Sequence, residues 1–96
     1  MPYYLMLSSL TQCGRDRIKH DPDRILQVNL EIEDQGCSVV SQYALLGQYD
    51  FATLIEAPGN AHMSHLSVDL GAPGTIDTET LPVEPTELFI EAMKGD

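Results

Sequence analysis

The sequence predicts a single small domain of the α+β class. Its 96 residues suit one compact unit with one small core. The first observation is a set of short apolar segments with the alternation or length of β-strands, at residues 3–10, 37–46, 51–57 and 75–81. The second is a helix pattern between the last two of these segments. Residues 22–35, between the first two, decide the topology.

The first predicted strand, residues 3–10, has two apolar faces. One face carries Tyr3, Leu5 and Leu7, and the other carries Tyr4, Met6 and Leu10. We therefore expect something to cover both sides of this strand. Residues 11–19 are mostly polar and contain Gly14, which predicts a loop or an irregular start of a helix.

Residues 22–35 fit two structures. Positions 26–33 alternate strictly between apolar and polar residues, which alone predicts a half-buried strand. Wrapped as a helix, the segment shows an apolar stripe through Ile25, Val28 and Ile32. The Asp21-Pro22 opening, the Gly36 stop and the length favour the helix. The local pattern favours the strand, these boundary signals favour the helix, and both alternatives stay open at this point.

The segments 37–46 and 51–57 are expected to pair as a hairpin, with Val39, Tyr43 and Leu45 on one face of the first of them. At the corner between them, Gly47 can adopt a positive φ and Asp50 can accept backbone amide hydrogen bonds. The Pro58-Gly59-Asn60 step ends the hairpin and begins a helix that runs to about Leu70. The inner stripe of this helix is Met63, Leu66 and Leu70.

The last predicted strand, residues 75–81, is polar and carries Asp77 and Glu79. Charges of this kind are typical of an edge strand protected from wrong pairing. Residues 82–85 have the sequence Pro-Val-Glu-Pro, which predicts a rigid connector. A short terminal helix then begins at Thr86.

The two apolar runs joined by Gly47-Gln48-Tyr49-Asp50, residues 44–58 in all, resemble the signature of the GYD domain family. The resemblance extends over about residues 3–81 and returns at 70–75 and 78–81. These small proteins mostly have no assigned biochemistry, so the resemblance transfers no catalytic role. It implies that residues 22–35 form the first helix of the domain.

With that helix the order is β-α-β-β-α-β, the ferredoxin-like pattern. Right-handed crossovers would place both helices on one face of a four-stranded antiparallel sheet, in the spatial order fourth, first, third, second. The first three strands are apolar on both faces, so the other face also needs a cover. The simplest cover is a second copy, as in dimeric α/β barrels, and we predict a homodimer or larger.

The net charge of −10 is unevenly distributed. Four of the five basic residues fall within residues 15–24, and residues 25–93 contain none. An acidic surface repels nucleic acids and anionic membranes, so we expect neither as a partner. The basic window is interleaved with acids, which favours a solvated turn over its alternative, an anion pocket.

Residues 3–10 are too short for a signal peptide or a membrane span, which predicts a cytoplasmic protein. Cys13 and Cys37 would lie at opposite ends of the sheet. That separation predicts two free thiols.

Tyr49 and Asp50 are the first candidate site residues, as a proton-transfer pair with Asp50 desolvated. Turn chemistry and interface packing explain the same residues, and we favour that interpretation. Tyr3, Tyr43 and His20 are candidates for ligand contacts. The usual role of strand tyrosines is packing, and His20 is expected to be exposed.

His62, His65 and Asp69 would share one face of a helix, and this ligand set suits Zn²⁺ or Fe²⁺. The face is opposite the apolar stripe, so a solvated polar surface explains it without a metal. We predict no metal and no cofactor.

No Gly-rich phosphate loop, Gly-x-Ser-x-Gly elbow or Cys-x-x-Cys pair is present. The leading hypothesis is therefore a small homo-oligomeric binding or assembly module with room for a small molecule between sheet and helices. The first alternative is a cofactor-independent enzyme of the oxygenase or isomerase type, which rests on fold analogy alone. The second is a purely structural assembly subunit.

Overall fold

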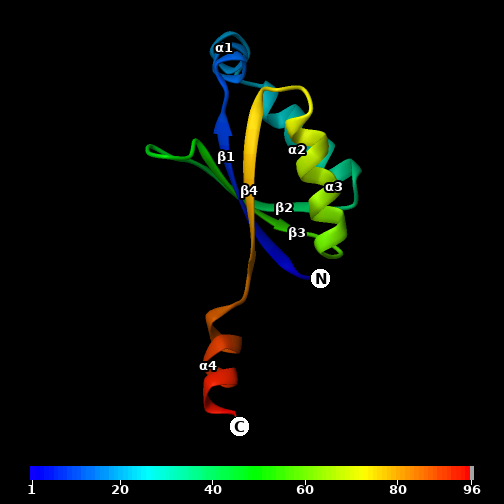
Figure 1. Ribbon diagram of the computed structural model, residues 1–96, viewed down its shortest axis with the longest axis vertical. Coiled ribbons are helices and arrows are strands. Elements are labelled where there is room, and N and C mark those ends of the chain that lie inside the picture. The colour runs from blue at the N-terminus through cyan, green and yellow to red at the C-terminus, as the bar shows by residue number, and fades with distance from the viewer. Residues whose placement is uncertain (96) are drawn as a thin grey trace.

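The computed structural model of the protein describes residues 1–95, which form one antiparallel sheet and four helices (Figure 1). The elements in chain order are β1 (Tyr3–Leu10), α1 (Gln12–His20), α2 (Arg24–Asp34), β2 (Ser38–Ala44), β3 (Phe51–Glu56), α3 (Asn60–Gly71), β4 (Ile76–Val83) and α4 (Thr86–Lys94).

The sheet has the order β2-β3-β1-β4, and all its pairs are antiparallel. This is the predicted order, with β1 in the interior and the acidic strand β4 at an edge. Helices α2 and α3 lie on the same face of the sheet (Figure 1). The α+β architecture therefore fits a ferredoxin-like fold, as the sequence predicted.

The hydrophobic core lies between this face and the two helices. Tyr4 and Met6 of β1 and Ile55 of β3 are buried, and Ile32 of α2 and Leu66 of α3 pack against them with no exposed surface. The alternation predicted for β1 is confirmed, because its even-numbered residues from Tyr4 to Ser8 are buried and its odd-numbered ones are half-buried.

The ambiguous segment is a helix, so the prediction from the family resemblance is confirmed over residues 24–34. Ile32 is fully buried, and Val28 packs against the core. Leu26 and Leu30, which made the alternation look like a strand, are 60% and 59% exposed. Helix α2 buries only the apolar residues on one side of it. The exposed Leu26 and Leu30 produced the alternation of apolar and polar residues that suggested a strand.

Of the two alternatives expected for residues 11–19, a loop and an irregular start of a helix, the loop is wrong, because α1 is a regular helix there. Thr11 caps it: Thr11 Oγ1 accepts a hydrogen bond from Gly14 N at 3.1 Å and donates one to Gly74 O at 2.7 Å. Gly14 allows close packing. A Cβ atom at this position would lie 1.9 Å from Thr75 O. The glycine therefore lets α1 approach the start of β4.

Strand β2 departs from the predicted alternation. A register shift between Val39 and Ser41 places Val39 toward the helices and Tyr43 on the other face, where Tyr43 is 64% exposed. The strand ends at Ala44, so Leu45 and Leu46 lie outside it. Residues 51–56 alternate as predicted, with Thr53 and Ile55 buried.

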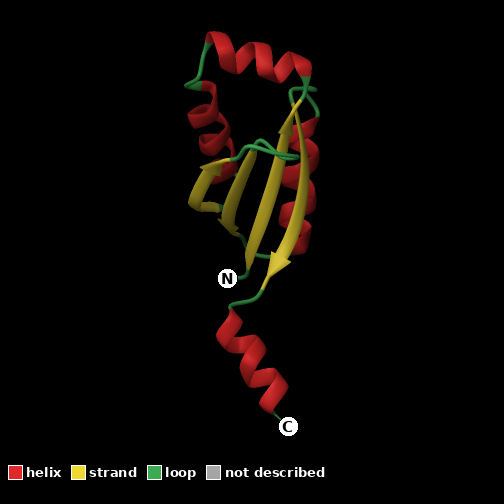
Figure 2. Ribbon diagram, turned by 90° about the vertical axis from the view of Figure 1, so that its left-hand side faces the viewer, coloured by secondary structure: helices red, strands yellow, loops and turns green. Residues whose placement is uncertain are grey.

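The C-terminal part also differs from the predicted connector. Strand β4 continues through Pro82 to Val83, and the edge position explains why a proline is tolerated there. Helix α4 follows and projects away from the sheet (Figures 1 and 2). None of its residues is buried, and the molecule is 53 Å long and 18 Å thick. The apolar side chains of α4 are Leu88, Phe89, Ile90 and Met93.

Candidate functional site

The sheet has an apolar face opposite α2 and α3, which we call the open face. Leu5 lies at its centre, beside Leu54 of β3 and Leu81 of β4. The strand register adds the flanking apolar side chains Tyr3, Leu7, Tyr43, Ala52 and Val83 on the same face, together with the carboxylates of Glu56 and Glu79. No helix within residues 1–95 covers this surface (Figure 1). The exposed apolar side chains make this face a candidate interaction surface.

The Gly47–Asp50 corner curls over one end of the open face. Gly47 has φ +152°, as predicted for this turn. The Asp50 carboxylate accepts a hydrogen bond from Leu10 N at 2.7 Å, and Asp50 N donates to Ser8 O at 2.7 Å. Asp50 therefore ties the hairpin loop to the end of β1, the strand beside the hairpin.

Tyr49 reaches from this loop to β4. Its hydroxyl donates to Glu79 Oε1 at 2.5 Å. This hydrogen bond is the main cause that raises the pKa of Tyr49, and desolvation and the negative charge of Glu79 add to it. The polar groups of Tyr49 and Asp50 thus have separate partners. Neither of these two hydrogen bonds joins Tyr49 to Asp50.

The three candidates for ligand contacts lie apart from one another. Tyr3 and Tyr43 are on the open face, on strands separated by β3. His20 is exposed at the end of α1, where its Nδ1 lies 2.8 Å from Asp16 O. The buried tyrosine is Tyr4, whose hydroxyl donates to Asn60 Oδ1 at 2.6 Å.

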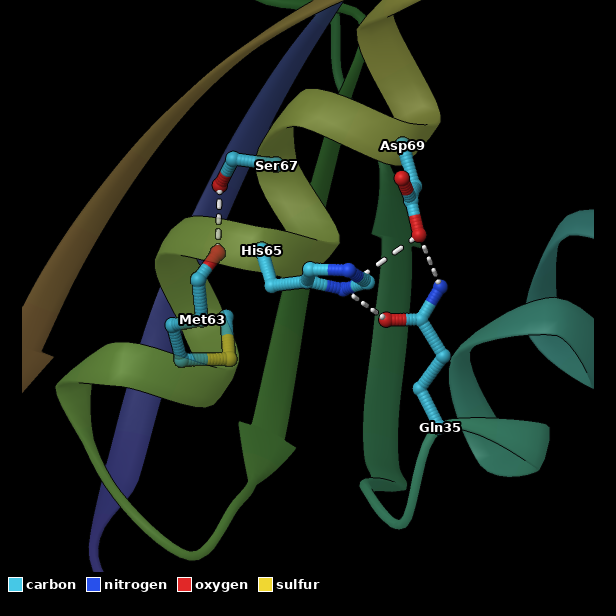
Figure 3. A network of polar contacts seen from close by, with 5 residues as sticks. All are labelled: Gln35, Met63, His65, Ser67 and Asp69. Carbon is cyan, nitrogen blue, oxygen red and sulfur yellow. Dashed lines mark hydrogen bonds and ion pairs between the residues drawn. The ribbon is translucent and has the colours of Figure 1, made fainter.

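The polar face of α3 contacts the end of α2 through a small network (Figure 3). His65 Nδ1 lies 3.2 Å from Gln35 Oε1 and 3.3 Å from Asp69 Oδ2, and Gln35 Nε2 donates to Asp69 Oδ2 at 2.9 Å. His62 lines a shallow surface hollow with His65 and Gln35. Within residues 1–95, no three His, Cys, Asp or Glu side chains are grouped so that they could hold a metal ion.

The two cysteines are both free thiols, as predicted. Cys13 is exposed on α1. Cys37 is buried just before β2, and burial raises the pKa of its thiol.

A cavity of about 50 Å³ lies between α1, α2 and the sheet, and we call it the α1–α2 cavity. Arg17 of α1 and Arg24 of α2 line it together with a mostly apolar wall that includes Ile18, Ile25, Val28 and Phe51. No local motif in the sequence predicts this cavity. The one sequence signal is the basic window at residues 15–24, for which an anion pocket was the less favoured alternative.

The sheet side of the cavity is partly polar, and hydrogen bonds order two of its polar side chains, Gln42 and Thr53. Gln42 Nε2 donates to Asn29 Oδ1 and to Thr53 Oγ1, both at 3.1 Å. Asn29 Nδ2 donates back to Gln42 Oε1 at 2.9 Å. Thr53 and Ser8 are buried hydroxyl residues that also line the cavity. This network explains Asn29, the polar residue that interrupts the apolar stripe of α2.

These features define a small α+β protein with an uncovered apolar sheet face and a projecting amphipathic helix. The sequence model of the GYD domain matches residues 4–93, and the chain belongs to the GYD domain family. The match extends beyond the resemblance seen at residues 3–81 and includes most of α4.

A curated protein of Thermus thermophilus is 39% identical to this chain over 95 residues, covering 98% of this chain and 100% of the relative. That relative is named glutamine synthetase and cystathionine beta-lyase binding protein. No solved structure matches the chain. Within residues 1–95, no helix has the length and apolar character to cross a membrane.

Proposed function

We propose that this protein is a cytoplasmic binding module that associates with itself through the open face and binds metabolic enzymes through α4. The observation that carries the proposal is the presence of two separate apolar surfaces on one small domain. The name of the Thermus thermophilus relative supports the class of partner, because it designates a binding protein for two enzymes.

Self-association through the open face follows from the position of Leu5, Leu54 and Leu81 in the sheet. Two such faces can pack at about 10 Å, as in sandwiches and dimeric barrels. Four strands of up to eight residues present a face of roughly 500 Å², from the usual strand spacing and rise. Two copies would then bury about 1,000 Å² in total, near the lower limit for a specific interface.

Enzyme binding is assigned to α4 because its apolar side chains contact little of their own domain. Leu88 and Phe89 are 51% and 52% exposed, and Met93 is 70% exposed. An amphipathic helix docks its apolar face into a groove of a partner, and aromatic residues commonly supply most of the binding energy there. The Pro82-to-Pro85 segment holds the helix clear of the sheet and leaves this face accessible.

The test is binding to the glutamine synthetase of the same organism, measured by surface plasmon resonance. Phe89→Ser should weaken binding at least about tenfold, as expected for the loss of one buried aromatic contact. Glu91→Gln on the same helix is the matched control and should stay within about twofold. Because α4 has no buried residue, neither change should lower the melting temperature. Unchanged binding by Phe89→Ser would overturn the assignment to α4.

The enzyme alternative requires a cavity lined by His, Tyr or Asp with a perturbed pKa. The α1–α2 cavity carries Arg17 and Arg24 instead, and its lining within residues 1–95 has none of those three residue types. A purely structural subunit would have a filled core. The cavity thus favours the binding module with room for a small ligand.

A further inference from the structure

We propose that the α1–α2 cavity binds a small monocarboxylate with a short apolar chain. The carboxylate would lie at Arg17 and Arg24, and the chain would enter between α2 and the sheet. This inference rests on the ligand cavity of the proposed function and names the class of ligand that it takes.

The arginines give the cavity a positive charge in an otherwise acidic protein. Arg24 is half-buried and Arg17 is exposed, and both line the cavity. Neither forms an ion pair with a carboxylate within residues 1–95. Arg24 Nη1 donates one hydrogen bond to Gln27 Oε1 at 3.0 Å, which leaves its other donors available.

Arg15, in the same basic window, has a different role. Its Nη1 donates to Leu10 O at 2.8 Å, and it does not line the cavity. Among the basic residues of this window, Arg17 and Arg24 are therefore the ones that line the cavity. Guanidinium groups bind carboxylates with two parallel hydrogen bonds, and such charge-assisted bonds are stronger than neutral ones.

The wall and the volume select the rest of the ligand. Ile18, Ile25, Val28 and Phe51 give the cavity an apolar wall that a chain of carbons would contact. A water-sized group needs about 10–15 Å³ of such space, so about 50 Å³ holds roughly four groups. A long fatty acid does not fit, and a phosphate would leave the apolar wall uncovered.

The probe that matches these dimensions is 3-methylbutanoate, which has four apolar carbons beside its carboxylate. It has seven heavy atoms, so a Kd of roughly 1 mM is expected from the usual binding energy per atom. The full chain would be titrated while amide chemical shifts are followed by NMR. Saturable shifts in residues of α1, α2 and β3 around the cavity are the expected result.

The neutral isostere 3-methylbutanamide tests the role of the charge without any mutation. It should bind at least about tenfold more weakly, because a charge-assisted contact with arginine is lost. Arg17→Gln combined with Arg24→Gln should weaken the acid by a similar factor. Lys19→Gln lies in the same last turn of α1 as Arg17 and does not line the cavity. This control should change binding by less than about twofold.

Equal binding of the acid and the amide would overturn the proposal, as would an absence of saturable shifts with the acid. An equal effect of Lys19→Gln and the double arginine variant would also overturn it. The oligomeric mass of the same samples would be measured by light scattering, and their binding to glutamine synthetase would be measured by surface plasmon resonance. If self-association and enzyme binding persist while 3-methylbutanoate fails to bind, only the ligand inference is wrong. If the wild-type protein neither self-associates nor binds glutamine synthetase, the proposed function itself is wrong.

Discussion

Asp50 has a different role in each interpretation of the Gly47–Asp50 corner. It is a member of a proton-transfer pair in one, and it stabilises the turn in the other. Its carboxylate accepts the Leu10 amide at 2.7 Å, and its own amide donates to Ser8 O. We predict that Asp50→Ala destabilises the fold by about 2 kcal/mol, because a half-buried amide loses a charged acceptor. For a domain of this size, that loss lowers the melting temperature by roughly 8–16 °C.

The assay is thermal unfolding followed by circular dichroism, with two companions. Asp50→Asn keeps a neutral oxygen acceptor and should recover about half of the loss. Asp77→Asn removes the same charge from the exposed edge strand and should change the melting temperature by only a few degrees, as is usual at such surface sites. If Asp50→Ala has the same melting temperature as the Asp77→Asn control, Asp50 does not anchor the hairpin loop to β1.

Two further predictions concern the packing of α1 and the corner tyrosine. Gly14→Ala should destabilise the protein by at least about 2 kcal/mol, because its Cβ would lie 1.9 Å from Thr75 O. Gly71→Ala is the control and should be tolerated in the same unfolding assay, because its Cβ would lie 3.8 Å from the nearest atom, Ile76 O. The Tyr49 pKa is raised, so its hydrogen bond to Glu79 stabilises the fold below the ordinary tyrosine pKa, and that contribution is lost as the pH rises through the raised value. Tyr49→Phe should remove this alkaline part of the pH dependence, and ultraviolet titration should show that the raised phenol pKa has disappeared. An unchanged titration would contradict the contact.

The sequence was sufficient to predict most of the sheet. The apolar residues of the segment 3–10 predicted strand β1 and placed Tyr4 and Met6 on the same face, and the acidic residues of the segment 75–81 predicted the edge position of β4. Both predictions depend only on the local sequence pattern. The sequence did not show which face of β1 the helices cover. The register shift after Val39 was not predictable in this way. A bulge changes the face of every later residue in the strand, and no residue type marks it here.

The sequence did not decide between a loop and a helix for residues 11–19, and the reason is physical. Gly14 has a low helix propensity, and this argued for a loop. In the structure its missing side chain is required by the approach to Thr75 O, a contact between residues far apart in sequence. A glycine that serves packing cannot be distinguished from one that breaks a helix without knowledge of its neighbour.

The candidate sites also depend on contacts between residues that are far apart in the sequence. The contact between Tyr49 and Glu79 joins residues 30 apart, and the α1–α2 cavity combines side chains from both helices and all four strands. Neither arrangement has a local motif. The basic window at residues 15–24 was visible, but only the fold separates Arg17 and Arg24 from Arg15.

The proposed association of two copies through the open face can be measured by light scattering after gel filtration, over a wide range of protein concentrations. We expect a mass of at least two chains of 10.6 kDa for the wild type. Leu5→Asp should shift the mass to that of the monomer, because it would bury a carboxylate between two sheets. Leu30→Asp, the same substitution on the exposed side of α2, should leave the oligomer intact. A wild-type mass of one chain at every concentration would refute association through the open face.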